Sequence, residues 1–206
     1  MIEEIGSKLR IMHDYARSRK DQVHRCVPPD RFLVNGVYNP VRVLENFVLS
    51  PFNYLSENAN KTKFLNRVVH ETINKIDREV KRLANKVDYK EQYCTLVHGD
   101  LNKSNLIMSP DGLKVIDWAN CRWDIASCDL AQFIHLYSLD QEEQELLIGS
   151  YNVPWINEEV LKIHQLLLLG WEVIYLIVND LDIKSEGLIY LRDLKHKIWS
   201  EKTLPL

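Results

Sequence analysis

The spacing of hydrophobic residues along this chain predicts a mostly α-helical protein. Apolar residues recur every three or four positions over residues 2–18. Over residues 60–88 they form one stripe opposite a charged face: Phe64, Val68, Ile73, Ile76, Val80, Leu83 and Val87. The same spacing predicts later helices over 131–137, 140–151, 158–179 and 185–199. Asn157 stands where the third of these later helices begins, and its side chain is of the type that caps helix N-termini.

Residues 19–59 follow no regular pattern. Pro28-Pro29, Asn39-Pro40 and Ser50-Pro51 should break any long element, so only short helices over 41–48 and 52–56 are predicted here. The aromatic residues of this region are interpreted as core beneath a long connection, with an acceptor-pocket wall as the alternative: Phe32, Tyr38, Phe47, Phe52 and Tyr54.

The centre of the chain has a different pattern, typical of a β-hairpin. A short strand over 93–97 precedes a polar loop, and the apolar runs 106–108 and 113–117 flank a Ser-Pro-Asp-Gly turn. Asp100 and Asn105 lie on the loop that enters this hairpin, and Asp117 lies at its exit. Because a hairpin folds back on itself, the three oxygen-bearing side chains should converge at one edge.

Such a convergence suits phosphoryl transfer. Mg²⁺ prefers a few hard oxygen ligands together with waters and phosphate oxygens. A carboxylate is also needed to position an acceptor hydroxyl and to take its proton. Protein kinases combine both in the pattern His-Arg-Asp-Leu-x-x-x-Asn followed by a metal-binding Asp. This chain has the same spacing from Asp100 to Asn105, with Gly99 in place of the Arg.

The run His98-Gly99-Asp100-Leu101 to Asn105, followed by Val115-Ile116-Asp117-Trp118, resembles the aminoglycoside phosphotransferase and choline kinase superfamily. The resemblance implies that Asp100 is the catalytic base, that Asn105 and Asp117 bind Mg²⁺ and ATP, and that His98 supports the catalytic loop.

Two later carboxylates extend the resemblance. Asp129, in Asp-Leu-Ala, would hold the catalytic loop through backbone hydrogen bonds. The role of Asp124 stays open, because Trp-Asp-Ile replaces the family's Gly-Asp-Pro, and Lys103 has no role in the family pattern. The His-Gly-Asp-Leu-Asn form also resembles a spore-coat kinase-like group.

By resemblance the chain is an α+β, mostly α-helical protein: the larger, C-terminal lobe of the protein kinase-like fold, as a single domain over 1–206 with its catalytic loop and metal-binding hairpin within 93–131. The smaller lobe that binds the nucleotide with a Gly-rich loop and a Lys has no counterpart among the motifs. We therefore expect little phosphotransferase activity unless such a lobe is supplied from elsewhere.

Three functions stay open. The first is an ATP- and Mg²⁺-dependent kinase acting on a hydroxyl of a small molecule. The second is a non-catalytic, kinase-like binding or structural protein, for example one associated with a spore coat. The third is a metal-dependent hydrolase that uses His98, Asp100 and Asp117, which would leave Asn105 unexplained.

Composition adds limits on partners and location. The formal net charge of −3 and the lack of a basic stripe argue against nucleic-acid binding. The four cysteines have no zinc-binding spacing and are predicted to be free thiols. The apolar run 166–178 is too short to span a membrane and is predicted to be a buried helix. With no secretory signal visible, a cytoplasmic protein is expected.

Overall fold

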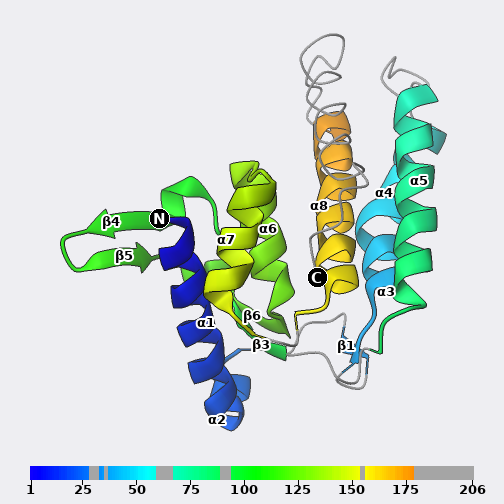
Figure 1. The fold of residues 1–206 in the computed structure, drawn as a ribbon. Helices are drawn as coiled ribbons and strands as arrows, with labels where there is room; N and C mark the ends of the chain where they lie inside the picture. The colour runs from blue at the N-terminus through cyan, green and yellow to red at the C-terminus, as the bar shows by residue number, and fades with distance from the viewer. Residues whose placement is uncertain (28–32, 35–36, 59–66, 89–93, 154–155, 179–206) are drawn as a thin grey trace. The chain divides into compact units, whose positions relative to one another are not determined.

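A computed structural model describes residues 1–27, 33–34, 37–58, 67–88, 94–153 and 156–178. The chain divides into two compact units (Figure 1). The first unit combines Met1–Tyr38 with Asp88–His164, and the second combines Asn39–Val87 with Gln165–Leu206. The predicted helix over 185–199 lies outside the described residues.

The first unit is built from helices that surround short antiparallel strand pairs. Its elements are α1 (Ile2–Ser18), α2 (Lys20–Cys26), β1 (Leu33–Val34), β2 (Val37–Tyr38), β3 (Cys94–Val97), β4 (Leu106–Ser109), β5 (Gly112–Val115), β6 (Arg122–Ile125), α6 (Ser127–Tyr137), α7 (Gln141–Tyr151) and the start of α8 (Glu158–Val178). Short 3₁₀ turns, η3 (Lys103–Asn105) and η4 (Trp118–Asn120), precede β4 and β6.

Helix α1 matches its predicted bounds, and its apolar face packs against α7 (Figure 1). Ile5 and Leu9 are fully buried on this face. A Cβ atom at Gly6 would lie 2.0 Å from Ser150 Oγ and 2.7 Å from the carbonyl oxygen of Leu147, so only glycine permits this approach. Helix α7 begins at Gln141, one position after its predicted start, and Asp140 is its N-cap, whose carboxylate accepts the amide of Glu143 in a capping box.

The predicted hairpin is confirmed. Strands β4 and β5 pair antiparallel from Leu106 opposite Val115 to Ser109 opposite Gly112. Strand β6 was not predicted, and it pairs antiparallel with β3, with Leu96 opposite Trp123. This pairing joins segments that are far apart in the sequence, so no local pattern predicts it.

The second unit begins with a continuous helical run: α3 (Pro40–Leu44), the π-helical turn η1 (Glu45–Leu49) and α4 (Ser50–Asn58). The prediction that Ser50-Pro51 breaks this run is wrong. Proline lacks an amide hydrogen, which normally disrupts a helix. Here the amide of Ser50 bonds to the carbonyl of Glu45 in a wide π turn, and the chain passes Pro51 without leaving the helical path.

Helix α5 (Arg67–Ala84) packs against α3, and its buried aliphatic residues form part of the apolar core of the second unit. Ile73, Ile76, Val80 and Leu83 are buried as the stripe predicts. Val68 is exposed, whereas its neighbour Val69 is buried, which corrects the start of the stripe by one position. Phe64, also assigned to the stripe, lies outside the described residues.

The aromatic residues of the irregular region divide between core and surface. Phe52 is buried and packs edge-to-face on the ring of His70, at 5.0 Å between centroids. Tyr54 is exposed, and Phe32 lies outside the described residues. The side chain of Phe47 is half-buried, so the interpretation as core holds best for Phe52.

Helix α8 is capped by Asn157, whose side-chain oxygen accepts the amide of Val160 at 3.0 Å, as predicted. By length and composition its segment Glu158–Ile177 could cross a membrane. In this structure, however, 67% of the most apolar window is buried inside the protein. Leu161, Ile163 and Leu166 are almost fully buried, so α8 is a core helix, as the sequence predicts.

Candidate active site

The loop between β3 and β4 holds Asp100 and Asn105 together. The side-chain amide nitrogen of Asn105 donates to the carbonyl oxygen of Asp100 at 2.8 Å and to its carboxylate at 3.1 Å. Asn102 donates a further hydrogen bond to the Asp100 carboxylate at 2.9 Å. Because its nitrogen is committed to Asp100, Asn105 presents its amide oxygen on the other side.

Asp117 follows β5 at the exit of the hairpin, where the sequence places it. Its backbone is left-handed, with φ 58° and ψ 72°, and its side chain is exposed. The preceding amide, of Ile116, donates to the carbonyl oxygen of Asn105 at 3.0 Å. One backbone hydrogen bond therefore joins the segment carrying Asp117 to the segment carrying Asn105, and through Asn105 to Asp100.

His98 makes a second connection between the segment that carries Asp100 and the segment that carries Asp117. Its Nδ1 accepts the amide of Asp100 at 3.2 Å, and its Nε2 donates to the carbonyl of Ile116 at 2.9 Å. The ring also packs edge-to-face on Trp118, 4.7 Å between centroids. His98 is completely buried and both ring nitrogens are engaged, so it has no lone pair left for a metal, which argues against the hydrolase alternative.

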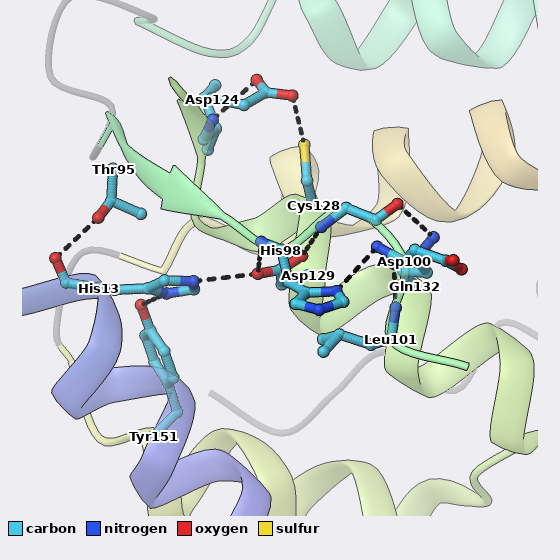
Figure 2. Close-up of polar contacts among 12 residues, drawn as sticks. His13, Thr95, His98, Asp100, Leu101, Asp124, Cys128, Asp129, Gln132 and Tyr151 are labelled. Carbon is cyan, nitrogen blue, oxygen red and sulfur yellow. Dashed lines mark hydrogen bonds and ion pairs between the residues drawn. The ribbon is translucent and has the colours of Figure 1, made fainter. Parts of the chain in front are cut away.

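Asp129, the one carboxylate of α6, is buried and lies beside the loop (Figure 2). One of its oxygens accepts the amide of His98 at 2.8 Å, and the other accepts the amide of Gly99 at 2.9 Å. These are contacts of the kind that the family resemblance implies for Asp129. They fix the backbone of the loop immediately before Asp100.

Asp129 is in turn held by α1 and α7 (Figure 2). His13 Nε2 contacts the Asp129 carboxylate at 3.2 Å, and His13 Nδ1 contacts the hydroxyl of Tyr151 at 2.7 Å. Burial alone would raise the pKa of Asp129, but the hydrogen bond and charge of His13, with the two loop amides, outweigh burial and lower it. The carboxylate therefore stays ionised inside the protein.

Gln132, one helical turn after Asp129, makes a second connection that the sequence did not reveal (Figure 2). Its side-chain oxygen accepts the amide of Leu101 at 2.9 Å, and its nitrogen donates to the carbonyl of Gly99 at 3.1 Å. Gly99 has φ 75°, and a Cβ atom there would lie 2.7 Å from the backbone carbonyl oxygen of Asn120. Glycine is therefore required where protein kinases have Arg.

Asp124, whose role the sequence left open, lies in β6 and is buried. Its carboxylate accepts from Nε of Arg122 at 3.0 Å and from the thiol of Cys128 at 3.3 Å. Cys128 also lies 3.1 Å from Nε2 of His164. Burial raises the pKa of the Cys128 thiol well above its usual value, so this cluster supports the fold and is not a reactive nucleophile.

The donor set around the loop fits Mg²⁺. The amide oxygen of Asn105 and the carboxylate of Asp117 are hard oxygen ligands, and this ion needs few protein ligands when phosphates are also bound. Within the described part of the chain, no group of three or more His, Cys, Asp or Glu side chains is arranged to bind a metal. A cation here would depend on Asn105, on Asp117 and on oxygens from a ligand.

Several solved structures that share this fold are described as small-molecule kinases or phosphotransferases. Choline kinase LicA from Streptococcus pneumoniae matches 97% of this chain at 18% identity, with a TM-score of 0.63. The AMP-bound complex of spectinomycin phosphotransferase APH(9)-Ia matches 98% at 13% identity, with a TM-score of 0.67. A choline/ethanolamine kinase family protein from Mesorhizobium loti matches 97% at 15% identity, with a TM-score of 0.60.

The match covers 63%, 66% and 61% of those three proteins, so this chain spans less than two thirds of their length. Its fold is the mostly α-helical, C-terminal part of the protein kinase-like fold, as the sequence predicts. No curated protein sequence matches this chain. The sequence profile of the phosphotransferase enzyme family matches residues 49–160, more than half of the chain, and includes the whole catalytic loop and hairpin. This chain therefore belongs to the phosphotransferase enzyme family.

Proposed function

We propose that this protein is the catalytic lobe of an ATP- and Mg²⁺-dependent kinase that phosphorylates a hydroxyl group of a small molecule. The observation that carries the proposal is the pair of hydrogen bonds from Asn105 to Asp100, together with the backbone bond from Ile116 to Asn105. These contacts bring a proton acceptor and two hard oxygen ligands into one loop and hairpin.

Asp100 has the role of the general base. Its carboxylate is half-buried and is oriented by amide donors from Asn102 and Asn105, so it can receive the proton of an acceptor hydroxyl from a fixed direction. His98, Asp129 and Gln132 hold the backbone on either side of it. Pre-organisation of this kind supplies much of the catalysis of phosphoryl transfer.

Asn105 and Asp117 are the proposed ligands of Mg²⁺. When bound, this ion neutralises the negative charge of the nucleotide phosphates. The chain's own contribution is orientation. The nitrogen of Asn105 is held by Asp100, and its oxygen, which accepts one hydrogen bond from Ser104 at 3.4 Å, has a second lone pair for the cation. Asp117 is held by its left-handed backbone and by the amide of Ala119, which donates to one carboxylate oxygen at 3.4 Å.

The acceptor and the nucleotide lobe are also part of the proposal. Structural relatives are described as kinases of choline, ethanolamine or spectinomycin, each of which has a hydroxyl group, and three are complexes with AMP or ADP. Because the relatives are longer, we propose that a further lobe, in the same polypeptide or in a separate one, completes the ATP site. The location of the whole protein stays predicted as cytoplasmic.

The test compares Asp100→Asn with Asp111→Asn, the same chemical change in the exposed turn of the same hairpin. Phosphate transfer from Mg·ATP to choline, ethanolamine and spectinomycin would be measured for the chain alone and for the chain joined to the nucleotide lobe of LicA. We expect Asp100→Asn to lower kcat by roughly 10²–10⁴-fold and Asp111→Asn to leave it unchanged. Equal rates for Asp100→Asn and the wild type would refute the assigned base.

Binding without turnover would favour the second function, a non-catalytic kinase-like protein. In that case isothermal titration would show metal-dependent ATP binding that Asp117→Asn weakens, while no hydroxyl compound is phosphorylated by either form of the chain. An absence of metal-dependent ATP binding in both forms would contradict the kinase proposal.

A further inference from the structure

Lys103 is the one charged residue of the catalytic loop to which neither the family pattern nor the proposed function gives a role. It begins the 3₁₀ turn that ends at Asn105, and it follows Asp100 by three residues. Because such a turn rises by only about 2 Å per residue, the flexible side chain of Lys103 can reach a ligand bound beside Asp100 or Asn105. The side chain of Lys103 is exposed.

The ammonium group of Lys103 forms no ion pair with a carboxylate of the described residues. Asp100 is satisfied by the side-chain amides of Asn102 and Asn105. No carboxylate within the described residues forms an ion pair with Lys103, whereas Lys114, on the adjacent hairpin, pairs with Asp111 at 3.7 Å. The loop therefore carries an unpaired cation beside the group that would face the transferred phosphate.

An aromatic ring determines where this cation rests. The Nζ atom of Lys103 lies over the ring of Tyr137, 5.6 Å from its centroid. That ring stacks on Phe133 at 4.3 Å between centroids, and Phe133 is completely buried in α6. The position of the ring is thus set by the core. A cation–π contact at an exposed site is weak compared with a charge-assisted hydrogen bond to phosphate.

We infer that Lys103 is a phosphate-binding residue of the candidate active site: its ammonium group leaves the Tyr137 ring and bonds to the terminal phosphate of a bound triphosphate. The inference rests on the proposed function, and it adds a positive charge supplied by the loop itself. A lysine contributes this charge as a compact group with three donors. It complements Asp117 and Asn105, which bind through oxygen.

The experiment uses the full chain, with inorganic tripolyphosphate and ATP as separate probes, each titrated in the presence of Mg²⁺. Lys103→Gln removes the charge, and Lys103→Arg keeps it. We expect Lys103→Gln to weaken tripolyphosphate binding about tenfold or more, which corresponds to the loss of one charge-assisted hydrogen bond. Lys103→Arg should bind within a few-fold of the wild type. Lys86→Gln, an exposed lysine of the second unit, is the control for net charge and should bind as the wild type does.

Two variants of the ring test the resting position. Tyr137→Phe keeps the aromatic face and should bind tripolyphosphate normally. Tyr137→Leu removes the face that the ammonium group must leave in order to bind phosphate, and we expect binding to become about two- to fivefold tighter. A structural defect alone would instead weaken tripolyphosphate binding by the same factor whether Tyr137→Leu is introduced into the wild type or into Lys103→Gln.

The outcomes separate this inference from the proposed function. Equal tripolyphosphate binding by the wild type and Lys103→Gln, or binding by neither, overturns the role of Lys103. Equal weakening by Lys86→Gln also overturns it, because the effect would then be one of net charge. If Lys103→Gln loses tripolyphosphate but the wild type shows no metal-dependent ATP binding, Lys103 remains a phosphate-binding residue and the kinase proposal fails.

Discussion

The interiors of the two units differ in chemistry. In the first unit, many polar side chains are buried among the apolar ones, and most of them bond to one another or to the backbone: His13, Thr95, His98, Asn105, Asp124, Ser127, Asp129, His135 and His164. Among the described residues of the second unit, Thr72 is the only buried polar side chain, and its hydroxyl bonds to the preceding turn of its own helix.

This difference indicates where the structure is specified for chemistry and where it is specified for packing. Buried polar groups are costly unless every one of them is bonded, so a unit that retains them needs exact positions. In the first unit the bonds of His98, Asn105 and Asp129 converge on the loop around Asp100. The second unit gains its described core from aliphatic residues of α5 and its neighbours, whose burial is non-directional.

Asp129→Ala should give the largest effect. The substitution leaves His13 and the amides of His98 and Gly99 without their acceptor inside the protein. We expect a loss of roughly 3–5 kcal/mol in the free energy of unfolding, measured by urea denaturation. Amide hydrogen exchange should accelerate at residues 98–101 and stay unchanged in α5. A loss as small as that of the exposed control Asp111→Ala would show that the buried network does not stabilise the loop.

A pH effect of intermediate size is expected from His164. Burial, followed by the positive charge of Arg122, lowers the pKa of His164 to about 3. Between that value and about 6.5, the usual pKa of histidine, the unfolded chain binds more protons than the folded one. Stability should therefore rise with pH and be lost on acidification, by up to about 1.4 kcal/mol per pH unit from this group.

His164→Gln should flatten that slope when urea unfolding is followed at pH 6.5, 5.5 and 4.5. The folded pKa of Asp129 is also lowered, because His13 and two backbone amides outweigh burial and favour its ionised form, and its contribution is lost only as the pH falls below about 4. An unchanged slope in His164→Gln over this range would mean that His164 is protonated in the folded protein.

Ile76→Val should have the smallest effect and should be confined to packing. Ile76 is completely buried in α5, and the removal of one methyl group costs about 1 kcal/mol. No polar group loses a partner, so exchange at residues 98–101 should not change. An acceleration there comparable with that in Asp129→Ala would remove the distinction between the two interiors.

The sequence predicted the elements whose signals are local. The bounds of α1 and α7, the β4–β5 hairpin and the cap of α8 follow from residues within one or two turns of each other. The three residues proposed for catalysis and metal binding also came from local spacing. The spatial link between them was inferred from the hairpin and corresponds to the bonds through Asn105 and Ile116.

What the sequence did not reveal depends on contacts between distant segments. The hydroxyl of Tyr151 contacts His13, which is 138 positions away in the sequence. Strand β6 pairs with β3 although the whole β4–β5 hairpin lies between them in the chain. No motif marks Gln132, because a glutamine that bonds to a distant backbone segment cannot be distinguished in a sequence from a glutamine on the surface. The error at Pro51 had another cause: a π turn, which has no simple sequence signal, satisfied the backbone around the proline.

The left-handed backbone at position 117 limits which amino acids can occupy it without strain. Apart from glycine, asparagine and aspartate adopt this conformation at the lowest steric cost, and longer or branched side chains adopt it poorly. Glutamate would keep the carboxylate but add strain, whereas asparagine would keep the turn but lose the charge. Aspartate alone among the twenty satisfies both demands, so conformation and chemistry select the same residue independently.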